Sequence, residues 1–263
     1  MWSKADLQAA LHHVADEHGV TVLFAAEGGS RAWGMASANS DYDVRFVYAH
    51  PPHEYLTNGS PLDNISETRQ DIMDIVGWDV RKTLGLLRRG NVAIYEWLRS
   101  PDLYVETPWS KLLLAVALQY FQPRACIFHY YGLAYRNYKA YLANTDPVNT
   151  KKYLYVLRSV LCCRWAEVMG TPPPVAFSVM LDYLCDDVQH DILDQTHKLI
   201  RRKQEGEEMG LEPPNSLLNA YIEGELKRFK TKAEGMAHGV KPDQDVLKLL
   251  MLSALGTEAM VTR

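Results

Sequence analysis

The sequence predicts a chain in two parts, an α/β part over roughly residues 1–107 and an all-helical part over roughly residues 108–255. Three observations predict this division. Compact runs of β-forming residues alternate with helical patterns before Pro108. Beyond Pro108, apolar residues recur with helical spacing and strand signals are few. A length of 263 residues suits one large domain or two modest ones. We expect residues 256–263 to form a disordered tail.

The first part is expected to begin with a helix and to contain three strands. Ser3 and Asp6 form a capping-box pattern ahead of an apolar stripe, and Gly19 is a typical helix end. Strands are expected where apolar and β-branched residues gather, at Val20–Ala26, Tyr42–Tyr48 and Gln70–Val76. Residues 53–66 are rich in turn-forming residues and predict a loop.

Helices are expected after the third strand and throughout the second part. Asp79 and Asn91 are typical N-caps, and they predict helices through Arg89 and Leu98. Helical periodicity then runs over residues 111–142 and 150–169, and Gly170 ends the second of these segments. Two or three further helices follow the prolines at 172–174.

The composition is that of an ordinary globular protein. Apolar residues make up 47% and charged residues 23%, and a net charge of −4 excludes a strongly basic nucleic-acid coat. We interpret the basic run Arg201-Arg202-Lys203 as a solvated helix face. No stretch reaches the roughly 18 apolar residues of a membrane span, and the N-terminus has no apolar signal region. The four cysteines lack metal-site spacing, so we expect them to be reduced and buried. We therefore expect a cytoplasmic protein that does not associate with a membrane.

A glycine-serine pair follows the first expected strand directly. Gly29 lets the backbone approach a ligand closely, and exposed N–H groups at a helix start attract phosphate. Ser30 and Arg31 come next and are candidates for phosphate binding. Read alone, the pair is more often a simple turn, and Arg31 is equally a surface charge.

Carboxylates mark the second and third expected strands. Period two places Asp41 and Asp43 on one face, where their charges repel unless a cation lies between them. Asp74 lies within an apolar strand, where a carboxylate needs a cation or strong hydrogen bonds. The alternatives are an exposed turn for the pair and a solvent-facing edge strand for Asp74. Asp79 competes as third acid, although helix capping explains it more simply. Arg45 shares the face of the pair and either balances these charges or binds substrate.

The order glycine-serine, short spacer, Asp41-x-Asp43, later strand aspartate resembles the DNA polymerase β-like nucleotidyltransferase superfamily. A longer set of blocks resembles the predicted nucleotidyltransferase family associated with RNA ligases and RNA repair. The resemblance covers roughly residues 20–175 and is specific, because five separated blocks match in order. One departure is Gly28, where this family more often has serine. The blocks are residues 27–34, 40–48, 77–82, 96–101 and 151–158.

The resemblance implies an α+β fold, in which a mixed sheet with flanking helices is followed by an all-helical substrate-binding domain. It also implies transfer of a nucleoside monophosphate from an NTP, ATP first among them, with pyrophosphate leaving. Asp41 and Asp43 would hold two Mg²⁺ ions, with Mn²⁺ as a possible substitute, and Asp74 would share one ion. Nucleotide binding is expected from Gly29, Ser30, Arg31, Arg45, Lys151, Lys152, Tyr155 and Arg158. By their spacing, either Lys151 or Lys152 shares one helix face with Tyr155 and Arg158, and the alternative role of these residues is a basic face over core aromatics.

The acceptor stays open at this point. An RNA 3′ end is favoured by the resemblance to RNA-repair proteins. Nucleotidylation of a protein or small molecule is the second hypothesis, and a non-catalytic nucleotide-binding protein is the third. The complete set of Ser30, Asp41 and Asp43 argues against the third. The sequence does not indicate an oligomeric state.

Overall fold

The computed structural model describes residues 2–57, 59, 61–69, 72–185, 188–206 and 209–256, and it divides into two compact units. A sheet unit comprises residues 1–32, 40–120 and 240–263, and a helical unit comprises residues 33–39 and 121–239. The expected boundary at residue 107 differs from this division. The helices α5 (Pro108–Gln119) and α11 (Gln244–Ala254) belong to the sheet unit, because α5 packs on the sheet and α11 packs on α5. Of the expected tail, residues 257–263 lie outside the described residues.

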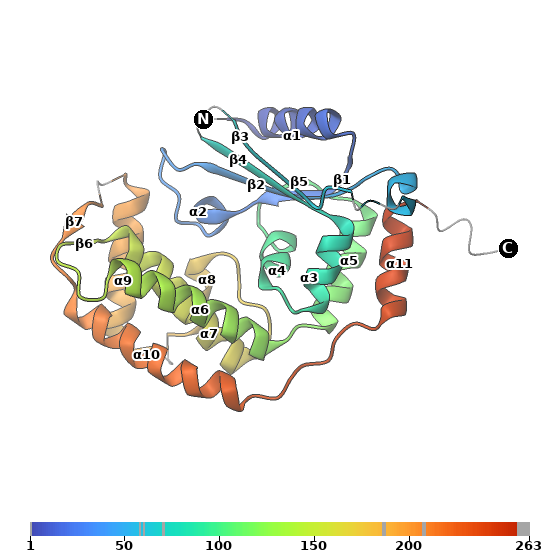
Figure 1. The fold of residues 1–263 in the computed structure, drawn as a ribbon. Helices are drawn as coiled ribbons and strands as arrows, with labels where there is room; N and C mark the ends of the chain where they lie inside the picture. The colour runs from blue at the N-terminus through green and yellow to red at the C-terminus, as the bar shows by residue number, and fades with distance from the viewer. Residues whose placement is uncertain are drawn as a thin grey trace. The chain divides into compact units, whose positions relative to one another are not determined.

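The sheet unit is built on a five-stranded mixed sheet in the order β3-β4-β2-β1-β5. The pairing of β2 with β4 is parallel and the other pairings are antiparallel, so the expected α+β fold with a mixed sheet is confirmed. Figure 1 shows α1 on one face of this sheet and α3, α4 and α5 on the other. The elements are α1 (Lys4–His18), β1 (Thr21–Glu27), α2 (Gly29–Ala32), β2 (Tyr42–Ala49), the short 3₁₀ helix η1 (Pro52–Leu56), β3 (Asn64–Arg69), β4 (Met73–Asp79), α3 (Val80–Arg88), α4 (Val92–Leu98) and β5 (Leu103–Val105).

The alternation of side chains in β2 and β4 decides which residues face the core under α1 and which project from the opposite face of the sheet. Tyr42, Val44 and Phe46 of β2 pack with Met73 and Ile75 of β4 in a core that α1 covers with its leucines. Because successive side chains point to opposite faces, the charged residues between them project from the other face of the sheet. The sequence period of two therefore places Asp43, Arg45 and Asp74 together.

The expected strands are present with shifted ends, and two strands of the sheet, β3 and β5, were not expected. The third strand begins at Met73 and runs to Asp79, whereas it was expected over 70–76; residues 70 and 71 lie outside the described residues. The strand β3 lies in and beyond the expected loop over 53–66. It is an edge strand with the sequence NISETR, in which Ile65 is the one buried residue, so it lacks an apolar run.

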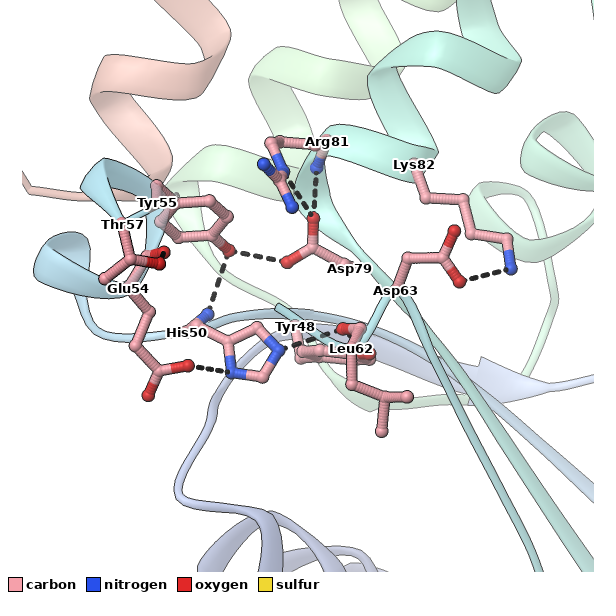
Figure 2. A network of polar contacts seen from close by, with 10 residues as sticks. All are labelled: Tyr48, His50, Glu54, Tyr55, Thr57, Leu62, Asp63, Asp79, Arg81 and Lys82. Atoms are coloured by element: carbon pink, nitrogen blue, oxygen red, sulfur yellow. Dashed lines mark hydrogen bonds and ion pairs between the residues drawn. The ribbon is translucent and has the colours of Figure 1, made fainter. Parts of the chain in front are cut away.

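A buried polar network joins η1 to the ends of β2 and β4 (Figure 2). The Tyr55 hydroxyl donates to Asp79 Oδ2 at 2.6 Å and accepts from the His50 backbone N–H at 2.9 Å. Asp79 Oδ1 accepts from the Arg81 backbone N–H at 2.8 Å, which is the N-cap of α3 that the sequence predicts. Asp79 is fully buried, and these bonds account for both of its carboxylate oxygens. It therefore has a structural role.

The helical unit is centred on α7, which packs against the other four helices of the unit. The strands β6 and β7 pair as a short antiparallel ribbon, so the second part, which was expected to be all helical, also contains this ribbon. Cys126, Cys162 and Cys163 are buried as expected, whereas Cys185 is exposed. Within the described residues, no helix is long and apolar enough to span a membrane. The elements are α6 (Pro123–Tyr141), β6 (Val148–Asn149), α7 (Lys151–Met169), α8 (Phe177–Tyr183), α9 (His190–Gln204), β7 (Leu211–Glu212) and α10 (Ser216–Gly235).

Candidate functional site

Two carboxylates and one guanidinium meet on the face of β2 and β4 that is opposite α1. Asp43 and Asp74 are direct partners in the parallel register of the two strands. Arg45 Nη2 lies 2.5 Å from Asp43 Oδ1 and 2.8 Å from Asp74 Oδ2, and Arg45 Nη1 donates to the Asp74 carbonyl at 2.9 Å. The structure thus brings together three of the predicted site residues. In this arrangement Arg45 balances the charge of the two carboxylates, which is one of its two expected roles.

The electrostatic environment of Asp43 favours an added positive charge. Burial raises the pKa of the Asp43 carboxyl above its ordinary value, Arg45 opposes this shift, and the negative charges of Asp74 and Asp41 reinforce it. A group surrounded in this way holds its charge more easily when a cation approaches. The cluster therefore has the electrostatic character of a cation-binding site.

The turn after β1 is fitted closely around Asp43. The Gly28 backbone N–H donates to the Asp43 carbonyl at 2.7 Å. Gly29 follows with a φ of +54°, and a Cβ at this position would lie 1.8 Å from Asp43 Oδ2. Only glycine combines that backbone conformation with that approach. Ser30 is half-buried in the first turn of α2 and lies next to this contact in sequence.

The Glu27 side chain, at the end of β1, accepts a hydrogen bond from the backbone of Asp43 in β2. Its side chain is 2% exposed, its Oε1 accepts from the Asp43 backbone N–H at 2.8 Å, and its Oε2 accepts from the Tyr104 hydroxyl. Burial is the main cause of a raised pKa for Glu27, and these hydrogen bonds act against the rise. Glu27 therefore positions the backbone of Asp43. The sequence signal for it was a carboxylate at the end of an apolar strand, whereas nothing in the sequence pointed to Tyr104.

Asp41 and Arg31 lie in and beside the segment that enters β2. Asp41 precedes the strand and is exposed. Arg31 donates to the carbonyls of Ser40 at 2.6 Å and Asp41 at 3.1 Å, and its guanidinium lies 3.8 Å from the centre of the Tyr42 ring. Arg31 thus holds the backbone that presents Asp41. Its predicted contact with nucleotide stays a prediction.

The four predicted site residues of α7 line one cavity in the helical unit. Its volume is about 550 Å³. The lining residues come from α6, β6, α7 and the segment over residues 33–39, and one of them, Trp33, was not expected there. They are Trp33, Leu133, Asn137, Asn149, Lys151, Lys152, Tyr155, Arg158 and Ser159.

Cationic side chains lie close to aromatic rings in and beside this cavity. Lys152 Nζ lies 4.0 Å from the centre of the Tyr141 ring and 5.9 Å from that of Tyr155. The Arg158 guanidinium is buried and lies 4.2 Å from the centre of the Trp33 ring, which meets Tyr155 edge-on at 5.8 Å. The arrangement offers positive charge and ring faces together, the chemistry that phosphates and bases require.

Lys203 corrects the interpretation of the basic run in α9. We expected Arg201-Arg202-Lys203 to form a solvated face, yet Lys203 is 8% exposed and its Nζ lies 5.5 Å from the centre of the Tyr155 ring. It faces inward because α9 packs on α7. A helical wheel of α9 separates Lys203 from its neighbours, but the sequence does not indicate which face is covered.

The oxygen donors of the sheet unit fit a hard divalent cation by their chemistry. Asp43 and Asp74 are adjacent in register, and Asp41 is close enough to influence Asp43 electrostatically. Within the described ranges, no group of three or more His, Cys, Asp or Glu side chains is gathered as a metal site. In this arrangement the Arg45 guanidinium lies between Asp43 and Asp74 and supplies the positive charge.

The mixed α+β fold is the one expected of a polymerase β-like nucleotidyltransferase. The chain belongs to the RlaP family, the RNA repair pathway DNA polymerase beta family, whose model matches residues 3–253. An uncharacterized protein of Bacillus subtilis (strain 168), YcgL, is 36% identical over 246 residues, which is 93% of this chain and 94% of YcgL.

A solved structure of a nucleotidyltransferase-like protein from Exiguobacterium sibiricum 255-15 is similar over 98% of this chain and 80% of its own, with a TM-score of 0.31 and 13% identity. At that TM-score the likeness carries no argument. The family match alone establishes the class of enzyme.

Proposed function

We propose that this enzyme transfers a nucleoside monophosphate from an NTP, with ATP as the first candidate, to the 3′ hydroxyl of an RNA. The observation that supports this most is the pair Asp43 and Asp74, held in register on parallel strands beside a glycine turn. The acceptor follows from membership of an RNA repair family. In the reaction the 3′ oxygen forms a bond to the α-phosphorus, the bond from that phosphorus to the bridging oxygen breaks, and pyrophosphate leaves.

The residues of the sheet unit have separate parts in this proposal. Asp41, Asp43 and Asp74 would hold the divalent cations, two Mg²⁺ in the simplest form. When bound, such ions neutralise triphosphate charge and lower the pKa of the attacking hydroxyl. Glu27 and Arg31 keep Asp43 and Asp41 in place through the backbone. The backbone N–H of Gly29 and the hydroxyl of Ser30 would donate hydrogen bonds to the β- and γ-phosphates, since glycine lets the backbone approach a ligand closely.

The helical unit would contribute recognition of the nucleotide. Lys151 and Lys152 offer ammonium groups for phosphate, and the Tyr155 ring offers a face for the base. Arg158 is buried against Trp33, so its contribution is positive charge at the floor of the cavity. These assignments account for every predicted nucleotide-binding residue of α7.

The transfer reaction is tested with α-labelled NTPs, Mg²⁺ and either RNA or total cell protein as acceptor. We expect label in RNA, and a loss on the order of a hundredfold to a thousandfold in Asp41→Asn and in Asp43→Asn. Asp63→Asn is the matched control, since Asp63 is an exposed carboxylate of the same unit that pairs only with Lys82 in Figure 2. Label in protein would instead indicate that the enzyme nucleotidylates a protein. Full activity in either site variant would refute the assignment of the carboxylates.

Metal binding has a readout that does not require activity. Arg45→Met removes the charge between Asp43 and Asp74, so we expect a loss of about 1–3 kcal/mol in stability without metal. Added Mg²⁺ should restore more stability in this variant than in the unmodified protein, because the cation replaces the lost guanidinium charge. Thermal melting with and without Mg²⁺ measures both effects. An identical response of the two proteins to Mg²⁺ would contradict the proposed ligands.

A further inference from the structure

The helix α6 combines aromatic and basic residues and carries no acidic residue. Its sequence, PRACIFHYYGLAYRNYKAY, contains no Asp or Glu, although the chain as a whole has a net charge of −4. Its basic residues are Arg124, Arg136 and Lys139. Five of the chain's 15 tyrosines lie in this one helix, at positions 130, 131, 135, 138 and 141.

Packing explains only part of this aromatic content. Tyr130 and Tyr138 are buried in the helical unit, where α6 packs on α7 and α10. Phe128 and Tyr135 instead have exposed fractions of 39% and 44%. They lie seven residues apart, so they share one face of the helix, and Tyr131 lies on the same side between them. Rings that gather along one helix face form a contiguous exposed patch, and such patches mark interaction sites more often than single exposed residues do.

The exposed rings are ordered. Tyr131 and Tyr135 stack on each other with their centres 6.0 Å apart and an angle of 28° between their planes. The Arg124 guanidinium lies 4.7 Å from the centre of the Phe128 ring, and it is held there by the Ala233 carbonyl at 3.2 Å. The rings are therefore oriented before any ligand arrives, which lowers the entropic cost of binding.

Positive charge accompanies the rings. Within the described residues, neither Arg136 nor Lys139 forms an ion pair with a carboxylate, and both are exposed. A Cβ at Gly132 would lie 3.3 Å from Arg136 Nη1, so the absence of a side chain there lets the guanidinium lie along the helix. These two cations can bind the phosphates of a polyanion, and the exposed rings beside them can stack with its flat, unpaired bases.

We infer that the outer face of α6, formed by Phe128, Tyr131, Tyr135, Arg136 and Lys139, binds single-stranded RNA by stacking unpaired bases on its rings. This inference rests on the proposed function, because the RNA is the acceptor strand. Arg136 and Lys139 contact the phosphates of the same strand. Duplex RNA does not fit this chemistry, since its bases are already stacked and paired. Leu133 and Asn137 of α6 line the cavity that contains Tyr155, and helical spacing places them on the side of α6 opposite Phe128 and Tyr135, so the strand and the nucleotide would contact different faces of one helix.

The experiment measures RNA affinity without NTP or metal. A labelled single strand of about 12 nucleotides, within the roughly 4–16 typical of such sites, is titrated with the protein and followed by fluorescence anisotropy. Phe128→Ala/Tyr135→Ala should weaken binding about tenfold or more, because two stacking surfaces are lost. Phe128→Tyr/Tyr135→Phe keeps both rings and should bind within about threefold of the unmodified protein. Tyr183→Ala, at an exposed tyrosine of α8, is the control off this face.

Salt dependence tests the cations separately. Arg136→Gln/Lys139→Gln should reduce the slope of log affinity against log salt by about 1.4, since each phosphate contact to a single strand contributes about 0.7. Circular dichroism checks that the exposed substitutions leave the fold intact. Equal affinity for duplex and single strand, or unchanged affinity in the Phe128→Ala/Tyr135→Ala variant, would overturn the inference. Binding of a cell protein on this face that requires Phe128 and Tyr135, in place of RNA, would overturn it as well.

The inference and the proposed function fail in distinguishable ways. If the unmodified protein labels RNA and the alanine variant labels it with the same KM, the function stands and the stacking face is wrong. If no RNA is labelled but the alanine variant loses affinity for single-stranded RNA, the stacking face stands and the proposed reaction is wrong. Asp43→Asn should retain RNA affinity in either case, since it alters the sheet unit only.

Discussion

Gly29 occupies a position that a larger residue cannot take without displacing Asp43. Its φ is +54°, and a Cβ would lie 1.8 Å from Asp43 Oδ2 and 2.6 Å from Asp43 Cγ. Two penalties are thus combined at one residue, a backbone conformation that favours glycine and a clash with a carboxylate. The sequence indicates the first of these through its glycine-serine pair. The second depends on the register of β1 with β2, which only the structure shows.

Substitution of Gly29 separates the two penalties when Gly19 serves as the control. Gly19 ends α1 with a φ of +60°, and a Cβ there meets nothing within 4 Å. We expect Gly19→Ala to cost about 1–2 kcal/mol of stability and to leave nucleotidyl transfer unchanged. Gly29→Ala should cost at least as much stability and in addition lower transfer at least about tenfold, because Asp43 must move. Melting curves and labelled-NTP transfer are the measurements. Equal transfer in the two variants would show that the position of Asp43 is unimportant.

The helices α7 and α10 are joined by ion pairs that a helical wheel does not reveal. Arg228 of α10 donates to both carboxylate oxygens of Glu167 in α7, at 2.8 and 2.6 Å, and to both of Glu225, at 2.9 and 2.8 Å. Lys232 Nζ lies 3.3 Å from Glu167 Oε1. The side chains of Glu167 and Glu225 are 16% and 13% exposed, so solvent screens these pairs less than it screens pairs on an open surface.

The stability of the helical unit should depend on pH through Glu167. Burial by itself would raise the pKa of Glu167, but the hydrogen bonds and charges of Arg228 and Lys232 lower it below its ordinary value of 4.5. A carboxylate with a lowered pKa stabilises the folded state fully above its unfolded pKa, and this contribution is lost as the pH falls through the folded pKa. Glu167→Gln should therefore be less stable than the unmodified protein at pH 7, by about 1–3 kcal/mol.

Urea unfolding at several pH values measures this effect. The difference between the unmodified protein and Glu167→Gln should shrink as the pH falls from about 7 to about 3, because protonation removes the same charge that the substitution removes. Glu205→Gln is the control, since Glu205 is an exposed acid of the same unit without an ion pair among the described residues. A difference that stays constant over the pH range would mean that Glu167 contributes through its shape and not through its charge.

For the whole molecule, local signals in the sequence predicted elements better than boundaries. The caps at Ser3, Asp79 and Asn91 are present as expected, because capping depends on a few neighbouring residues. The edge strand β3 was not expected because its residues are polar. The boundary expected at residue 107 differs from the division into units because α11 returns to the sheet unit from the end of the chain.

In the candidate site, residues with a local sequence signal were predicted, and residues that depend on distant contacts were not. Asp43 and Asp74 were identified from their strands, and the structure places them together. Tyr104 and Lys203 were not identified from the sequence, because their contacts join segments that are far apart in the sequence. The roles of Lys151, Lys152, Tyr155 and Arg158 in nucleotide binding stay predictions, although all four line one cavity.

The return of α11 predicts that the end of the chain stabilises the sheet unit. Leu247 and Leu250 of α11 are buried, and the Leu250 carbonyl accepts from Trp109 Nε1 in α5 at 2.9 Å. A chain that ends after Gly239 would leave this buried N–H without its acceptor and would expose the apolar surfaces of α3 and α5. We expect it to lose at least about 3 kcal/mol of stability, since each buried leucine contributes about 1.5–3 kcal/mol.

A chain that ends after Gly256 is the control, because it keeps α11 whole. The shortened protein retains Asp41, Asp43 and Asp74, so its nucleotidyl transfer should persist at low temperature and disappear at a lower temperature than in the control. Circular dichroism melting and transfer assays over the same temperatures measure the two effects together. If the chain ending after Gly239 melts at the same temperature as the control, α11 is not part of the sheet unit, and the boundary expected from the sequence would be the better description.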